Sequence, residues 1–379
     1  MAASFLFLFK NGSFEGNKKI PEEACIYFAK KIERSINQSD PTLLNDALDY
    51  HSFLKKVANN LGPYNKIQLV NLSVQVKENI RFGDMVMGYL KSSDGYFNFT
   101  KLYYQNRVPH IIFRIYSQME GLNYFDCEID RINGNLNITD VFIYYAGELW
   151  STSYFRHMKL LAEYNKGDLE NIHPENEFHN SLIKIAYIKD LLLLDQPELA
   201  EQIYLTIPRL FQNDKFFQGT ALKIAFRLSD SAYVMAIDQY ISSDLNNEPF
   251  NLFFNLLRSL ATKDNSKVRQ SITALNELTG QDSLMQLFIG QTFQNEHLYE
   301  KAIKNFENTI DRYPDLFETY WYKMVSLIQT KQYQKAVDFL DIIIINFEAR
   351  KIDFEDLLAE YPSFINSEEF LRWRNMVNI

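Results

Sequence analysis

Hydrophobic and polar residues follow two different periods along the chain, and the change of period divides it into regions. Up to about residue 90, apolar residues recur every three or four positions, which is the period of a helix that buries one face. The runs are 21–36, 40–60 and 65–90. The first run opens with Pro21 and two acidic residues, a combination typical of a helix N-terminus. We therefore predict three amphipathic helices in this part of the chain.

The period then changes to two, and apolar residues alternate with polar ones as they do in half-buried strands. The strand-like runs are 95–106, 108–121, 122–135 and 136–148. Turn residues separate them, and Asn-Gly between the last two runs is a strong hairpin signal. Because strands joined by short turns are antiparallel, the pattern predicts a four-stranded meander with the helices on one face, an α+β domain.

A polar stretch follows, and beyond it the pattern is helical to the end. We place a first domain at 1–165, a linker at 166–180 and an all-α domain at 181–379, because the stretch around Pro174 has no apolar period. Helices separated by short breaks fill this last domain. The expected helical pairs are 181–211, 214–243, 248–278, 283–312 and 316–347. The tail after them is expected to be a capping helix.

One of these pairs has small and aromatic residues at spacings that suit two closely packed helices. The signature residues are Gly290, Phe293, Ala302, Phe306 and Pro314, and Ala336 and Leu340 continue the pattern one unit later. The small residues let two backbones approach closely, and the phenylalanines fill the space beside them. The proline ends the second helix, because it has no N–H to donate and its ring clashes with the preceding turn.

This pattern resembles a tetratricopeptide repeat (TPR), and the resemblance extends over about 181–348. The helices and meander before it resemble the cone-shaped domain of NTF2-like proteins. The segments GLNYFDCEI and ITDVFIYYAGELWS are similar to an uncharacterised bacterial family in which such a sheet precedes TPR-type helices. The resemblance implies an architecture, namely an NTF2-like cone followed by a TPR-like solenoid. It implies no activity.

Polar side chains on the predicted strands form a first candidate site. Ile138, Asp140, Phe142 and Tyr144 are expected on one face of the last strand, because side chains alternate. The candidate residues of the cone are Arg114, Asp126, Glu128, Asp140 and Tyr144. They would form either an acid/base or ligand pocket, or a buried Arg–Asp pair that fixes the register of the strands. We favour the structural interpretation.

A second candidate site is the concave face of the TPR-like array. Its candidate residues are Gln286, Gln291, Tyr320, Tyr322 and Lys323. Tyrosine is an efficient contact residue, with a large area and few rotatable bonds. The alternative is that these tyrosines pack between the repeats.

Composition and charge exclude several classes of function. The net charge of −9, without a Lys/Arg-dense stripe, argues against nucleic-acid binding. None of the 6 histidines lies in a metal-binding motif, and no nucleotide-binding or nucleophile–base motif occurs. We therefore expect no metal and no cofactor. The apolar run 5–9 is too short to span a membrane.

These observations predict a non-enzymatic scaffold that binds a protein or peptide partner through the concave face of the array, with the cone as a second docking module. The alternative is small-molecule binding or simple acid/base chemistry in the cone. The N-terminus as it stands fits a cytoplasmic protein, and a removed signal would make it an exported one. Whether Cys25 and Cys127 form a bridge stays open, as do the partner's identity and the oligomeric state.

Overall fold

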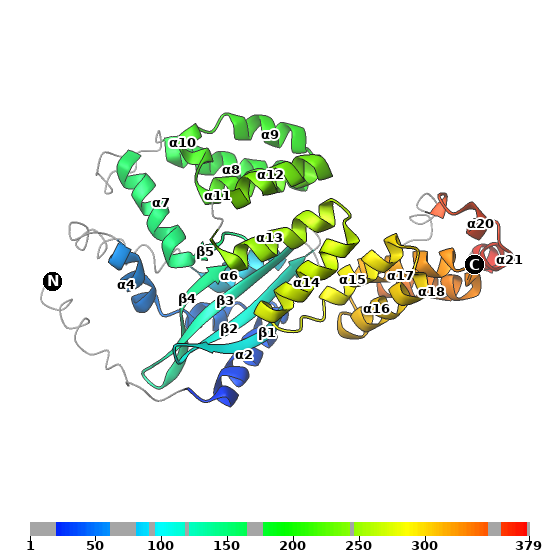
Figure 1. Ribbon diagram of the computed structural model, residues 1–379, viewed down its shortest axis with the longest axis horizontal. Coiled ribbons are helices and arrows are strands. Elements are labelled where there is room, and N and C mark those ends of the chain that lie inside the picture. The colour runs from blue at the N-terminus through cyan, green and yellow to red at the C-terminus, as the bar shows by residue number, and fades with distance from the viewer. Residues whose placement is uncertain are drawn as a thin grey trace, which may run out of the picture. The chain divides into compact units, whose positions relative to one another are not determined.

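A computed structural model of the chain describes residues 20–60, 81–90, 95–117, 121–164, 177–242, 246–347 and 358–376. The chain forms two compact units (Figure 1). Unit 1 consists of Met1–Arg258 with Leu278–Gly280, and unit 2 of Ser259–Glu277 with Gln281–Ile379. The apolar run 5–9, the first part of the predicted helix 65–90 and most of the predicted linker lie outside the described residues, so the predicted domain boundary stays a prediction.

Unit 1 is built on an antiparallel sheet whose strands follow one another in chain order. The strands are β1 (Tyr96–Gln105), β2 (Val108–Ser117), β3 (Gly121–Ile132), β4 (Asn135–Ile143) and the short β5 (Glu148–Leu149). The predicted meander is confirmed, and β5 extends it to five strands. Asn133 and Gly134 both have positive φ, which matches the twist of a tight hairpin and explains the Asn-Gly pair.

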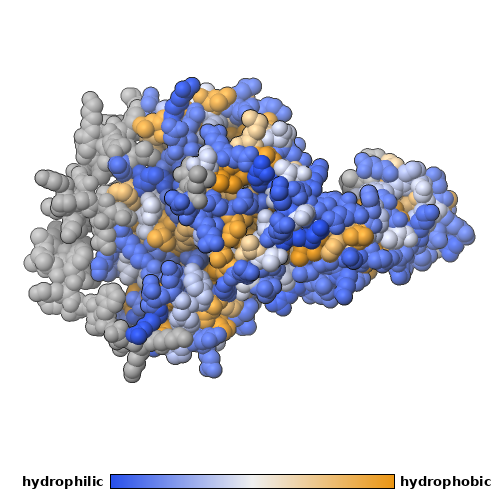
Figure 2. Space-filling view, in the orientation of Figure 1, coloured by the Kyte–Doolittle hydropathy of each residue, from blue (hydrophilic) through white to orange (hydrophobic). Residues whose placement is uncertain are grey.

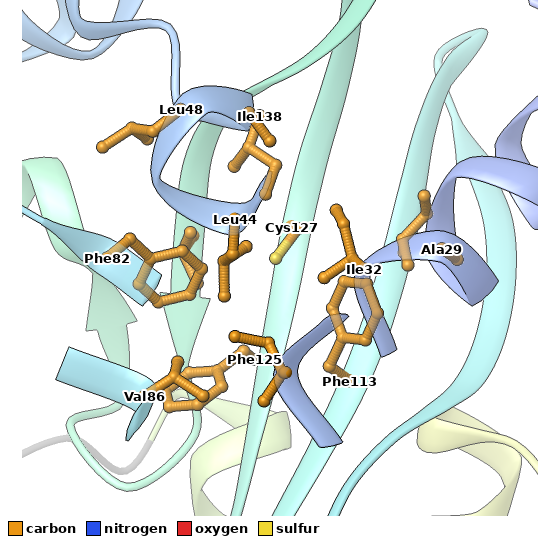
Figure 3. Close-up of a cluster of buried hydrophobic side chains, with 14 of the residues drawn as sticks. Ala29, Ile32, Leu44, Leu48, Phe82, Val86, Phe113, Phe125, Cys127 and Ile138 are labelled. Carbon is orange, nitrogen blue, oxygen red and sulfur yellow. The ribbon is translucent and has the colours of Figure 1, made fainter. Parts of the chain in front are cut away.

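Helices cover one face of this sheet and enclose its hydrophobic core. They are α2 (Glu22–Asn37), α3 (Thr42–Ala47), α4 (Tyr50–Asn60) and α6 (Phe82–Leu90). Figure 3 shows Ile32, Leu44 and Phe82 from these helices against strand residues such as Phe113 and Cys127. Cys127 and Cys25 are both buried free thiols. The predicted packing of helices on one face is therefore present.

The predicted single helix over 40–60 is wrong, because the backbone breaks between α3 and α4. At this break Leu48 forms a bridge to Ile138, and the N–H of Asp49 donates to the carbonyl of Ile138 at 2.8 Å. At this point the backbone therefore hydrogen-bonds to the outer edge of β4 instead of continuing the helix. The opposite edge of the sheet, β1, is covered at Phe97 by a side chain. The amide of Asn37 accepts from the N–H of Phe97 at 3.2 Å and donates to its carbonyl at 2.8 Å.

Further helices complete unit 1 and form most of unit 2. Those of unit 1 are α7 (Trp150–Tyr164), α8 (Glu177–Leu193), α9 (Pro197–Leu205), α10 (Arg209–Gln212), α11 (Lys215–Leu228), α12 (Asp230–Ser242) and most of α13 (Glu248–Ala261). Those of unit 2 are most of α14 (Asn265–Thr279), then α15 (Met285–Asn295), α16 (Tyr299–Arg312), α17 (Phe317–Gln329), α18 (Tyr333–Asn346), α20 (Pro362–Ile365) and α21 (Glu368–Met376).

Consecutive helices of unit 2 pack against each other, α15 on α16 and α17 on α18, as the predicted pairs require. The tail residues Phe364, Phe370 and Trp373 pack in one cluster with Leu340 of α18. Among the described residues no helix is long and apolar enough to cross a membrane. On the face of the molecule shown in Figure 2, hydrophobic residues lie in separate spots among hydrophilic ones.

Candidate functional site

The sheet face opposite the core carries polar side chains in rows that run across the strands. Three rows follow from the register: Tyr103–His110–Glu128–Asp140, Lys101–Ile112–Asp126–Phe142, and Asn98–Arg114–Tyr124. The three candidate acids therefore lie in neighbouring rows. Arg114 lies further along the sheet, where the ring of Tyr144 contacts that of Tyr124 at 5.5 Å. The sheet thus brings together Asp126, Glu128 and Asp140. The other two candidates, Arg114 and Tyr144, lie further from Asp140.

A bulge between Glu128 and Ile129 changes which residues of β4 share a face. Ile138 pairs with Ile129 and is buried in the core, whereas Asp140 pairs with Glu128 on the other face. The expectation that these two residues of β4 share a face is therefore wrong, because one extra residue in a strand reverses the alternation beyond it.

Asp140 is fully buried, and both of its carboxylate oxygens are engaged. One accepts from the backbone N–H groups of Val141 (2.9 Å) and Ser151 (3.2 Å), and the other from the Ser151 hydroxyl (2.5 Å). Lys56 lies 3.8 Å away. Burial raises the pKa of Asp140, and these partners offset part of the rise. Since Ser151 is in the first turn of α7, Asp140 attaches the start of this helix to β4.

The buried Arg114 does not pair with Asp140. It donates to the side-chain oxygen of Asn98, its neighbour on β1. Glu128 instead accepts from Lys56 of α4 at 2.7 Å and from the Thr139 hydroxyl at 2.8 Å. Burial opposes the ionisation of Glu128, but Lys56, Thr139 and His110 together outweigh it and lower the pKa. These contacts join α4 to the polar face of the sheet.

A further cluster on this face includes a histidine and a tyrosine that sequence analysis did not assign to the site. Asp126 accepts from the Tyr103 hydroxyl, and its other oxygen lies 3.0 Å from Nδ1 of His110. The two rings stack at 4.8 Å. Burial and the nearby carboxylate raise the pKa of Tyr103. Only the register of the first hairpin, which pairs Tyr103 with His110, could have pointed to this cluster.

The loop after β4 packs into the helices α11, α12 and α13. The hydroxyl of Tyr145 donates to the carbonyl of Gly219 at 3.1 Å, and the amide of Asn247 donates to the carbonyl of Gly147 at 2.6 Å. Gly147 has φ +66°, and a Cβ at this position would overlap the ring of Phe250. The segment therefore joins the sheet to the helices that follow it within unit 1.

A buried ionic cluster makes a second connection, between α7 and α11. Arg156 donates through Nε to Asp214 and through Nη1 to Glu148. His157 lies 3.4 Å from the other oxygen of Asp214. Asp214 also accepts from the N–H of Phe216 at 2.9 Å and thereby caps α11. Burial opposes ionisation of Asp214, but His157 and Arg156 outweigh it and lower the pKa to about 2.

Unit 2 contains an open groove with a volume of about 580 Å³. Its lining is mainly amide and aromatic side chains from the helices α14, α15, α16 and α17 and from the segment before α20. The lining residues are Lys263, Asn265, Gln294, Asn295, His297, Tyr299, Trp321, Tyr322, Val325, Gln329 and Tyr361. Sequence analysis assigned one of them to the groove, Tyr322.

The other predicted groove residues lie elsewhere. Tyr320 is buried in the core of unit 2 and stacks on Phe339 at 5.5 Å, so the alternative of packing between helices applies to it. Lys323 pairs with Glu307 at 3.0 Å and lies over the ring of Phe339. Gln286 and Gln291 are half-buried and do not line the groove.

The repeat signature residues Gly290 and Ala302 lie where α15 packs against α16, and Pro314 follows the end of α16. The face of Gly290 lies against the ring of Phe306, and Ala302 is fully buried. In the next pair, Ala336 and Leu340 are also fully buried. The ring of Phe293 is half-buried, and its centroid lies 5.6 Å from the guanidinium carbon of Arg269 and 5.5 Å from Nζ of Lys301.

Substituting Gly290 with alanine should lower the free energy of unfolding by about 1–3 kcal/mol, because a Cβ would overlap the ring of Phe306. Gly88 in α6 is the matched control, since no atom of the described residues lies within 4 Å of its Cβ position. There alanine should raise stability by about 0.5–1 kcal/mol through helix propensity. Urea unfolding of both variants measures the difference. Equal effects at the two sites would show that the contact between α15 and α16 is not close.

No family model and no curated protein matches the chain. Among solved structures, MamA (41-end) from Desulfovibrio magneticus RS-1 is similar at 13% identity, with 45% of this chain and 96% of that chain covered and a TM-score of 0.33. Another MamA crystal structure is similar at 13% identity, with 46% and 94% covered and a TM-score of 0.30. The fold described above rests on the chain's own contacts.

Proposed function

We propose that the chain is a non-enzymatic interaction protein whose helical pairs in unit 2 bind a protein or peptide segment in the groove. The observation that supports this proposal best is the lining of the groove. It combines the aromatic rings of Tyr299, Trp321, Tyr322 and Tyr361 with four amide side chains. Aromatic side chains offer large contact areas at low entropic cost, and amide side chains can both donate and accept hydrogen bonds. The TPR-like pattern of the helical pairs agrees with this use of the surface.

The sheet face is the site of the alternative, which is ligand binding or acid/base chemistry. The contacts of Asp140 and Glu128 favour a structural role there, because their oxygens already bind Ser151, Thr139 and Lys56. No group of three or more His, Cys, Asp or Glu side chains is placed to hold a metal ion within the described residues. The NTF2-like identity of this sheet, and its use as a second docking module, remain predictions.

Photo-crosslinking tests the proposed function. A photoreactive amino acid would replace Gln329, an exposed residue of the groove, and separately Gln334, an exposed glutamine of α18 that does not line it. We expect crosslinks to a protein from the source organism's lysate at position 329, weaker ones at 334, and loss of the former when Val325 is replaced with arginine. Equal crosslinking at both positions, or none at 329, would contradict the proposal.

A further inference from the structure

The amide side chains of the groove are held at one end by the protein itself. Nε2 of Gln294 donates to the carbonyl of Tyr322 and to the hydroxyl of Ser326, both at 3.1 Å. Nδ2 of Asn295 lies 3.4 Å from Oδ1 of Asn265, close enough for a weak hydrogen bond. These contacts limit the rotation of each amide before any partner binds, so little side-chain entropy is lost on binding.

The other ends of these amides are the groups available to a ligand. Gln294 and Asn295 each keep a carbonyl oxygen, which accepts hydrogen bonds, and Asn265 keeps an NH₂ group, which donates them. Gln329 at the exposed edge offers both kinds of group. A lining that mixes acceptors with donors matches the main chain of an extended peptide, which presents C=O and N–H groups in turn.

The charge of the lining limits the side chains that a partner can bring. The chain has 48 Asp and Glu residues and 39 Lys and Arg residues, yet the described residues that line the groove include no Asp or Glu, and from the second group they include Lys263. A basic peptide would find no carboxylate in this lining. An acidic peptide would find a cationic group at Lys263. Burying a charge without a partner is costly, so this lining complements an uncharged segment.

From these observations we propose that the groove binds an extended, uncharged peptide segment by its main chain, with the rings of Tyr299, Trp321, Tyr322 and Tyr361 accepting side chains of varied sequence. The partner class is therefore an unfolded or loop segment rich in neutral residues, recognised with little dependence on sequence order. This inference rests on the proposed function and specifies the partner.

The test uses the full chain and short, end-blocked, fluorescently labelled peptides of Ala, Ser, Thr, Gln and Leu, with binding followed by anisotropy. Scrambled orders of one composition should bind alike. Methylation of alternate backbone nitrogens should weaken binding by about tenfold or more, which corresponds to roughly 1.4 kcal/mol. Adding Lys should weaken it as well, and adding Glu should not strengthen it.

Variants of the protein locate the binding. Gln294→Leu and Asn295→Leu should each weaken binding by about tenfold, the loss expected for one hydrogen bond left unmade. Gln286→Leu is the matched control, because this glutamine of α15 lies outside the lining and should leave binding unchanged. Circular dichroism confirms that each variant is folded. The N-methylated peptides test the same hydrogen bonds without altering the protein.

Several results would overturn the inference: affinities that differ widely between scrambled orders, tighter binding of acidic peptides, indifference to N-methylation, or no binding of any neutral peptide. The crosslinker at position 329 separates this failure from that of the proposed function. If it still captures a protein, the groove binds a partner of different chemistry. If it captures nothing, both proposals fail.

Discussion

Replacing Arg156 with leucine should lower the free energy of unfolding by about 3–5 kcal/mol, because it removes the guanidinium that is paired with the buried carboxylate of Asp214. The Asp214 side chain is 2% exposed, and Arg156 also holds the largely buried Glu148. One substitution therefore affects two acids and the contact between α7 and α11. Chemical denaturation followed by circular dichroism measures the loss.

The matched control for this prediction is Arg258→Leu. Arg258 also donates to a carboxylate, that of Asp238, through Nε (2.7 Å) and Nη2 (3.3 Å). Both side chains of that pair are more than a third exposed, and such pairs contribute about 0–1 kcal/mol. A loss at Arg156 no larger than at Arg258 would show that the cluster around Asp214 is solvated.

The same cluster predicts how stability depends on pH. The pKa of Asp214 is lowered to about 2 in the folded chain and is about 3.9 in an unfolded one. A lowered pKa stabilises the folded state above the unfolded value, and this contribution disappears as the pH falls from about 4 through 2. Stability of the parent chain should therefore fall over this range. In Arg156→Leu the fall should be smaller, since the pKa of Asp214 is no longer lowered as far.

The second large effect is expected at Gly147, where alanine should cost about 2–5 kcal/mol. Part of this cost is the positive φ of +66°, which disfavours side chains by about 1–2 kcal/mol. The rest comes from overlap between the new Cβ and the ring of Phe250, at about 1–3 kcal/mol. Thermal or urea unfolding of the variant gives the total.

Gly134→Ala separates the two contributions. Gly134 also has positive φ (+85°), but in the part of the chain that the structure describes no atom lies within 4 Å of its Cβ position. It should show the backbone cost alone. The double variant Gly147→Ala with Phe250→Leu should recover part of the overlap cost, which the double-mutant cycle isolates. If Gly147→Ala and Gly134→Ala cost the same, the loop after β4 does not pack tightly against α13.

The sequence pattern was sufficient for those features that depend on neighbouring residues. The Asn133–Gly134 turn, the alternation of the strands and the pairing of α15 with α16 are all local, so they could be predicted. The break at Leu48 could not, because a hydrogen bond to Ile138 decides it. Contacts of this kind join residues far apart in the chain, as do those of Asp214 with Arg156, 58 residues away.

The candidate sites were harder to predict for a related reason. In a helix one position corresponds to a rotation of about 100°, so the choice between Tyr320 and Trp321 decides whether a ring is in the core or in the groove. In a strand one inserted residue also changes the face on which a side chain lies. Thr139 is such a residue of β4, and it puts Ile138 and Asp140 on opposite faces. The sequence pattern predicts which residue types lie at a site. The direction in which each side chain points depends on packing, which the pattern does not contain.

Asn37 has a consequence for how the protein is made. Its amide contacts the N–H and carbonyl of Phe97 as the peptide group of a neighbouring strand would, so this part of β1 is not open to another chain. Helix α2 precedes β1 in the sequence and leaves the ribosome first. Asn37 is thus synthesised before the strand edge to which it binds. This order limits the time in which nascent chains can pair through β1.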